Sequence, residues 1–149
     1  MKPFNIFIAL SIVIIFGGFF FFKDSFKTVK SNPSPTISPE LLMDRMSYLD
    51  YSKSNQVLSK KYGKTVLFFA ATTWCQTCSA LDKEIKMRLR DIPLDVTILK
   101  VDYDNDREMK TKYGVTQQHT LVVLDKDGNE LKRWIGGNFD LMLNELKEI

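Results

Sequence analysis

Cys75 and Cys78 are the only two cysteines of the 149-residue chain, and two residues separate them. Such a pair can form a structural disulfide, exchange disulfides with other molecules, or supply two ligands to a metal. Any sulfur chemistry of this chain must use this pair. Zinc normally takes four ligands, and the chain offers one histidine and no second cysteine pair. The spacing therefore favours redox chemistry over a structural zinc site.

The cysteine pair stands between a predicted strand and a predicted helix. The strand is the short apolar run 66–71, whose large hydrophobic residues are typical of a buried strand. The helix follows Cys78, because Leu81, Ile85 and Leu89 share one helical face. A helix N-terminus has unpaired N–H groups and a partial positive charge, so it stabilises an anion. The pair is therefore placed where a thiolate is favoured.

The position of each cysteine predicts its role. A thiolate is the attacking species in disulfide exchange, and a Cys-X-X-Cys motif at a helix start lowers the pKa of its first cysteine below about 8.5. Cys75 is therefore the predicted nucleophile. Cys78, one helical turn later, can attack a mixed disulfide at Cys75 and release the partner, so it is the predicted resolving thiol.

The chain resembles the thioredoxin superfamily over roughly residues 65–149. The Trp74–Cys78 box, the strand before it and the Lys112–Val115 stretch before a later strand occur in the order typical of that family. The resemblance implies an α/β fold in which helices flank a central mixed sheet. It also implies catalysed thiol-disulfide exchange between client proteins and an electron-donor or electron-acceptor protein, with no cofactor. The implied supporting residues around the cysteines are Trp74, Gln76, Thr77, Gln118, His119 and Thr120.

The box departs from the family pattern at two places. Gln76 and Thr77 separate the cysteines, where a typical thioredoxin has Gly-Pro, so the redox potential of the family cannot be transferred. The family also has a buried acid just before the box, and this chain has Phe68 or Phe69 there. The carboxylate that assists proton transfer in the family is therefore expected to be missing from this position.

A third departure concerns His119, the only histidine of the chain. In the stretch 114–120 it occupies the place of the family's cis-proline, which the resemblance puts beside the cysteines. A cis bond before a residue other than proline costs about 2.5–4 kcal/mol, so we expect a trans Gln118–His119 bond and a reshaped loop. Imidazole titrates near neutral pH, and we hypothesise that His119 tunes the pKa of the thiols.

Two alternatives for His119 remain open. Together with Cys75 and Cys78 it could bind a soft metal such as Cu(I), or Zn(II) with an outside ligand. It could also merely pack or cap its loop. At the level of the whole chain, the alternatives to a thiol-disulfide oxidoreductase are a Cys2His metal-binding or metal-delivery module and a non-catalytic thioredoxin-like interaction domain.

The N-terminal segment predicts a membrane anchor. No charged residue occurs between Pro3 and Phe22, and about 20 helical residues span the roughly 30 Å of a bilayer core. A cleaved signal peptide would have a shorter apolar core, of about 7–15 residues, followed by a small-residue cleavage site. We therefore expect an uncleaved signal anchor at 1–23, with residues 4–22 in the membrane.

The remainder is predicted to be a linker and one domain. Residues 24–38 are rich in proline and serine and should be extended, and residues 39–149 form the thioredoxin-like domain. The lysines that follow the apolar run weakly favour a cytoplasmic domain. Analogy with membrane-tethered members of the family favours the extracytoplasmic face, where disulfides persist. We expect a single-pass protein with the catalytic domain on that face.

The other expected elements alternate in type. A helix should begin at Pro39 after a Ser38 cap, with Met43, Met46 and Tyr48 or Leu49 on one face. The later expected elements are a strand at 96–101, a helix at 107–113 ended by Gly114, strands at 120–124 and 130–135 joined by an Asp127–Gly128 turn, and a last helix capped by Asn138.

Two binding functions are not expected. Residues 102–106 imitate the start of a calcium loop, but Arg107 and Tyr113 stand where an EF-hand requires glycine and an acid. The net charge of +3 is small and interleaved, without a basic block, which argues against nucleic acid as a partner.

Overall fold

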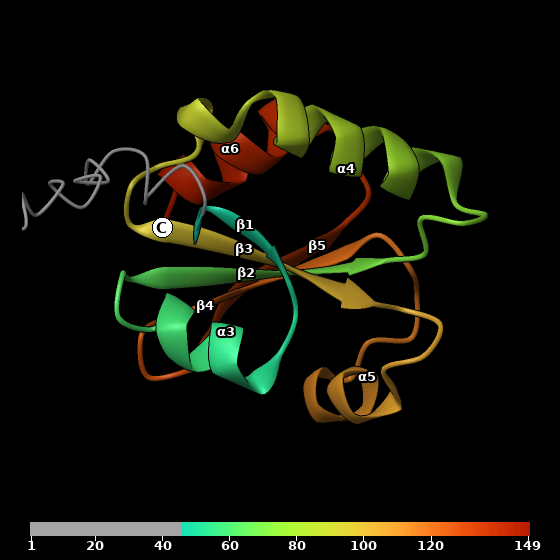
Figure 1. Cartoon of the computed structure of the whole chain (residues 1–149), viewed down its shortest axis with the longest axis horizontal. Helices are drawn as coiled ribbons and strands as arrows, with labels where there is room; N and C mark the ends of the chain where they lie inside the picture. The colour runs from blue at the N-terminus through green and yellow to red at the C-terminus, as the bar shows by residue number, and fades with distance from the viewer. Residues whose placement is uncertain (1–45) are drawn as a thin grey trace, which may run out of the picture. The chain divides into compact units, whose positions relative to one another are not determined.

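The computed structural model describes residues 46–149. The predicted anchor at 1–23, the linker at 24–38 and the start of the domain at 39 lie outside the described residues. Within 46–149, no helix has the length and apolarity needed to cross a bilayer. The described part is a five-stranded mixed sheet with helices on both faces (Figure 1).

The strand order in the sheet is β1-β3-β2-β4-β5. β1 and β2 both run parallel to β3, whereas β4 is antiparallel to β2 and β5 is antiparallel to β4. The strands are β1 (Tyr48–Asp50), β2 (Lys64–Ala70), β3 (Val96–Asp102), β4 (Thr120–Leu124) and β5 (Glu130–Ile135). The expected bounds of β4 and β5 are confirmed, and β3 extends one residue beyond its prediction.

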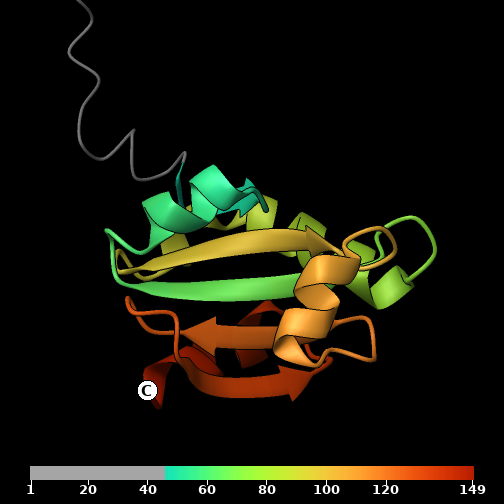
Figure 2. The same ribbon diagram turned by 90° about the horizontal axis from the view of Figure 1, so that it is seen from below.

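Helices cover the two faces of the sheet in pairs. α4 and α6 lie on one face, and α3 and α5 lie on the other (Figures 1 and 2). The helices are α3 (Lys53–Ser59), α4 (Gln76–Met87), α5 (Arg107–Tyr113) and α6 (Phe139–Lys147), and a short 3-10 turn, η1 (Leu89–Asp91), follows α4.

The central strand β2 divides the core into two clusters. Phe68 packs with the residues beneath α4 and α6, and Phe69 packs with those beneath α5. Both side chains are fully buried. A strand covered on both faces has no solvent side, which explains why its sequence is a continuous apolar run rather than an alternation. The rigid strand ends at Ala70, just before the cysteine box.

α5 and α6 begin and α5 ends at the capping residues that the sequence predicts. The Asp106 carboxylate accepts from the Met109 N–H and caps α5, while Gly114 ends this helix in the left-handed conformation with φ 60°. The Asn138 side chain accepts from the Leu141 N–H and caps α6. These local interactions depend only on neighbouring residues, so the sequence predicts them well.

The expected helical stripe ending at Tyr48 or Leu49 is wrong at its C-terminal end, because these residues form β1. The strand pairs with β3 in parallel, and the Ile98 N–H donates to the Ser47 C=O at 2.8 Å. Pairing with a strand about 50 residues away overrides the local periodicity. The next helix, α3, begins separately after Ser52, whose side chain accepts from the Asn55 N–H.

Candidate active site

Cys75 and Cys78 form a disulfide at the start of α4, with their Cα atoms 5.3 Å apart. Cys75 is the N-cap residue of this helix, and its Sγ accepts a hydrogen bond from the Cys78 N–H at 3.2 Å. The Cys75 residue is 7% exposed, whereas Cys78 is 0% exposed. Both residues are therefore buried, and Cys75 is the more exposed of the two.

The turn between β2 and α4 positions this disulfide. The chain leaves β2 at Ala70, and the Cys75 N–H donates back to the Ala71 C=O at 2.9 Å. This bond brings the first cysteine to the helix start immediately beyond the end of the buried strand. The Cys78 N–H in the first helical turn then donates to the Cys75 sulfur, which favours its anionic form.

Trp74 presents its ring to solvent beside the disulfide. The residue is 57% exposed. Its indole N–H donates to both carboxylate oxygens of Asp104, at 3.0 and 3.2 Å, from the turn after β3. The Asp104 carboxylate thus fixes the orientation of the exposed Trp74 ring next to Cys75.

His119 lies just before β4 and is held by its backbone. Its N–H donates to the Phe69 C=O at 2.8 Å, and its C=O accepts from the Gly136 N–H at 2.8 Å. The expectation of a trans Gln118–His119 bond is confirmed, because residues 46–149 contain no cis peptide bond. His119 instead has φ 60°, the only positive φ of a residue other than glycine in this part of the chain. The left-handed conformation of His119 therefore sets the direction in which the backbone enters β4.

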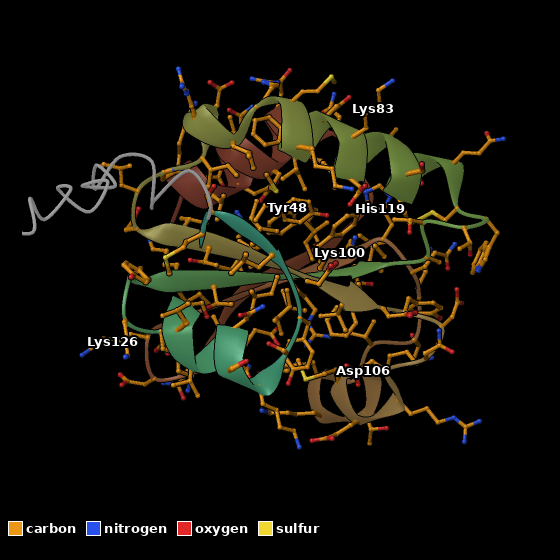
Figure 3. All side chains as sticks on the ribbon, in the orientation of Figure 1. Tyr48, Lys83, Lys100, Asp106, His119 and Lys126 are labelled. Atoms are coloured by element: carbon orange, nitrogen blue, oxygen red, sulfur yellow. A yellow bond between two sulfur atoms is a disulfide. The ribbon has the colours of Figure 1, made fainter. Side chains whose placement is uncertain are left out.

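The His119 side chain is buried between α4 and the sheet (Figure 3). Its ring centroid lies 5.6 Å from that of Phe68. Burial lowers the pKa of the imidazole below its ordinary value of about 6.5, and an interaction with the Gly137 backbone only partly opposes this. The ring is therefore mainly neutral at pH 7, so one of its nitrogens carries a free lone pair.

The Thr77 hydroxyl connects the histidine to the first cysteine. Its Oγ1 lies 2.9 Å from His119 Nδ1 and 3.3 Å from Cys75 Sγ. A hydroxyl donates one hydrogen and accepts others, so it can pass a proton between the two groups. His119 Nε2 is buried and makes no hydrogen bond of normal geometry among the described residues, so the interaction of the ring with the Gly137 backbone is a weak one.

The disulfide and His119 also form a potential metal-binding group. The ligand atoms of Cys75, Cys78 and His119 all lie within 4.8 Å of one another, and all three residues are buried. Within residues 46–149, no other histidine, cysteine or carboxylate joins them. The arrangement thus provides three ligands, two of them only when the disulfide is reduced.

The other predicted supporting residues lie around this centre. Gln76 is exposed on the first turn of α4, and Gln118 is partly exposed beside His119. Thr120 is buried, and its hydroxyl donates to the Gln117 C=O at 2.6 Å, which closes the loop before β4. Neither glutamine has a hydrogen bond in the described structure that assigns it a role in the chemistry.

A polar cluster beneath α4 was not predicted from the sequence. The Tyr48 hydroxyl donates to Asp82 at 2.6 Å, Lys86 pairs with the same carboxylate at 2.6 Å, and Lys100 lies 3.5 Å from it. Burial alone would raise the pKa of Asp82, but these partners hold it below its ordinary value. Figure 3 shows Tyr48 and Lys100 at the sheet under this helix.

Two sequence signals point to this cluster in retrospect. Asp82 lies four residues after Cys78, between the buried Leu81 and Ile85, so it belongs to the inner side of the helix. Lys100 is the one charged residue inside the apolar strand 96–101. The cluster joins β1, β3 and α4, and its ionised carboxylate is already neutralised by lysines.

Known proteins resemble the chain over this same region. The thioredoxin family model matches residues 46–148. A rice thioredoxin, thioredoxin H5 of Oryza sativa subsp. japonica, is 25% identical over 123 residues, which cover 72% of this chain and 87% of that protein. Protein disulfide isomerase-like 1-2 of the same plant is 31% identical over 102 residues, 65% of this chain but only 19% of that protein.

A solved structure has the same fold. The crystal structure of the thioredoxin NaTrxh from Nicotiana alata superposes with a TM-score of 0.58 and 24% sequence identity. The match covers 69% of this chain and 92% of that one. At this identity the likeness concerns the arrangement of the sheet and helices.

Proposed function

The chain belongs to the thioredoxin family, and on this premise we propose that it is a thiol-disulfide oxidoreductase that acts on client proteins through Cys75 and Cys78. The observation that carries the proposal is the asymmetric disulfide at the start of α4. Cys75 is the more exposed of the two buried residues, and its Sγ receives the hydrogen bond from the Cys78 N–H, while Cys78 is fully buried. This asymmetry supports attack on clients by the first cysteine and resolution by the second.

Reduction of a client proceeds in two exchanges. The Cys75 thiolate attacks one sulfur of the client disulfide, and the other client sulfur leaves as a thiolate and takes up a proton. Cys78 then loses its proton and attacks Cys75 Sγ, which releases the second client thiol and forms the Cys75–Cys78 disulfide. Two electrons pass from the protein to the client, and an electron-donor protein must restore the dithiol. The reverse sequence oxidises a client dithiol.

We further propose that Thr77 and His119 form a proton relay for Cys75. The distances of 3.3 and 2.9 Å support this relay, as does the neutral state of the buried imidazole at pH 7. A proton leaving the Cys75 thiol moves to Thr77 Oγ1 while the hydroxyl proton moves to Nδ1. The relay thus takes over a task that relatives give to an acid in the strand, where this chain has buried phenylalanines.

The activity is tested with the purified full chain and a protein disulfide such as that of insulin. The reduced protein should cleave the insulin disulfides, Cys75→Ser should abolish cleavage, and Cys78→Ser should accumulate a mixed disulfide with the client. Measurement of the reduction potential against glutathione then gives the direction. A value near about −270 mV indicates a reductant and one near about −120 mV an oxidant. Full cellular function of the Cys75→Ser/Cys78→Ser double variant, which has no thiol with which to cleave insulin, would instead favour a non-catalytic interaction domain.

We also propose that residues 1–23 anchor this domain to a membrane, with the active site on the extracytoplasmic face. The support is the uncharged apolar run of the sequence. A membrane-impermeant maleimide should label reduced Cys75 in intact cells, and a Cys75→Ser/Cys78→Ser variant controls for background. Labelling only after lysis would place the domain on the cytoplasmic side, and release by alkaline carbonate would argue against a spanning anchor.

A further inference from the structure

Reduction of the disulfide leaves two thiols and one imidazole facing one another at the start of α4. Their ligand atoms lie within 4.8 Å of one another in the oxidised protein, although the residues come from separate segments. We propose that the reduced protein binds one Cu(I) ion through Cys75 Sγ, Cys78 Sγ and one imidazole nitrogen of His119. This metal-binding function uses the same centre as the proposed disulfide exchange, but it requires only that the disulfide can be reduced.

The number and type of the ligands select the ion. Thiolates are soft ligands that favour Cu(I), and imidazole also suits copper. A Cu(I) ion is satisfied by three ligands, whereas structural zinc sites have four. Within residues 46–149, no histidine, cysteine or carboxylate supplies a fourth ligand to the group. The set is therefore complete for Cu(I) and incomplete for Zn(II).

The histidine is positioned before any metal arrives. Two backbone hydrogen bonds, to Phe69 and from Gly136, hold the residue in its left-handed conformation. Nε2 is buried and makes no hydrogen bond of normal geometry among the described residues, so binding through this atom breaks no such bond. Nδ1 can then donate to Thr77 Oγ1, the kind of outer hydrogen bond that orients metal-binding histidines.

The burial of the site and the charge around it favour a complex of Cu(I) with two thiolates. Cys78 is fully buried, and Cys75 and His119 are 7% and 4% exposed. The complex of one Cu(I) with two thiolates carries a net negative charge, which the Cys78 N–H and the start of the 12-residue helix α4 stabilise. The bound ion and the disulfide exclude each other, because both require the same two sulfurs.

The test titrates the reduced, purified full chain with Cu(I) under anaerobic conditions against bicinchoninate as competing chelator. One ion per chain is expected, and X-ray absorption should report two sulfur ligands and one nitrogen ligand. The matched variant is His119→Asn, because asparagine adopts positive φ more readily than most residues and lacks the imidazole. It should bind Cu(I) at least about tenfold more weakly, since even loss of an outer partner costs about 10–100-fold in affinity. The disulfide form should bind none.

Equal affinity of the wild type and His119→Asn would overturn the proposal, because the ion would then be held by the dithiol alone. Tighter binding of Zn(II) than of Cu(I) in matched titrations would refute the assignment of the ion. Insulin reduction by the metal-free samples separates the two functions: Cu(I) uptake without reduction counts against the exchange activity alone, and reduction without Cu(I) uptake counts against this inference alone. Circular dichroism confirms that the variant is folded.

Discussion

The relay from Cys75 through Thr77 to His119 makes a sharp prediction for Thr77→Val. Valine has nearly the shape of threonine and lacks only the hydroxyl, so this change removes the contacts of 3.3 and 2.9 Å from Oγ1 and leaves both end groups in place. In the thiolate state the hydroxyl donates to the charged sulfur and accepts from Nδ1–H. Its loss therefore disfavours the thiolate and raises the pKa of Cys75.

The size of the effect follows from the strength of one hydrogen bond to a charged group. Such bonds contribute about 1.5–3 kcal/mol. Thr77 is exposed and sulfur is a weak acceptor, so we take about 1.4 kcal/mol, which corresponds to about one pKa unit. Thr77→Ser keeps the hydroxyl and should shift the pKa of Cys75 by a small fraction of that amount.

The assay is the rate of Cys75 alkylation by iodoacetamide as a function of pH. All variants carry Cys78→Ser, so that one thiol reacts and its titration is read directly. His119→Asn in the same background removes the far end of the relay and should also displace the titration. An unchanged pH profile in Thr77→Val would refute the relay, and an equal displacement in Thr77→Ser would show that packing rather than the hydroxyl sets the pKa.

Three further predictions concern stability, each measured by urea unfolding. Burial lowers the pKa of His119, so the unfolded chain binds more protons than the folded chain. The contribution of His119 to the free energy of unfolding is therefore complete above about pH 6.5 and is lost as the pH falls toward the lowered pKa of the folded state. His119→Asn should remove this dependence of stability on pH. Gly63→Ala should cost more than about 2 kcal/mol, because a Cβ there lies 2.5 Å from a backbone oxygen at φ 137°, whereas Gly114→Ala meets no atom within 4 Å and should cost about 1–2 kcal/mol. Tyr48→Phe should cost about 1–3 kcal/mol by removing the hydrogen bond to Asp82; equal losses in the two glycine variants, or none in Tyr48→Phe, would contradict these interpretations.

The sequence predicts the elements whose determinants are local. The bounds of β4 and β5 follow from the apolar run 120–124 and the turn after it, and Gly128 has the positive φ that this turn requires. The caps of α5 and α6 depend on single side chains next to each helix. The position of Cys75 at a helix start follows in the same way from the strand before it and the apolar face after it.

Long-range pairing escapes such reasoning. β1 is three residues long, and only its partner β3 makes it a strand. The Thr77 hydroxyl bridges to His119, which lies in a loop 42 residues away. The position of Thr77 within the cysteine box therefore does not predict this contact. The resemblance to a family predicted that His119 stands near the sulfurs, but not that it would have φ 60°. The sequence therefore predicts the place of the cysteine pair better than the positions of the side chains around it.

The backbone bonds of His119 limit which residues can replace it. Its N–H and C=O extend the hydrogen-bond ladder of the sheet between Phe69, near the end of β2, and Gly136, just after β5. Proline has no N–H and fixes φ near −65°, so His119→Pro would lose the hydrogen bond to Phe69 and could not adopt φ 60°. A proline at position 119 would therefore require a different path of the loop 116–118. We therefore expect substitutions at residue 119 and in the loop 116–118 to have coupled rather than additive effects on stability.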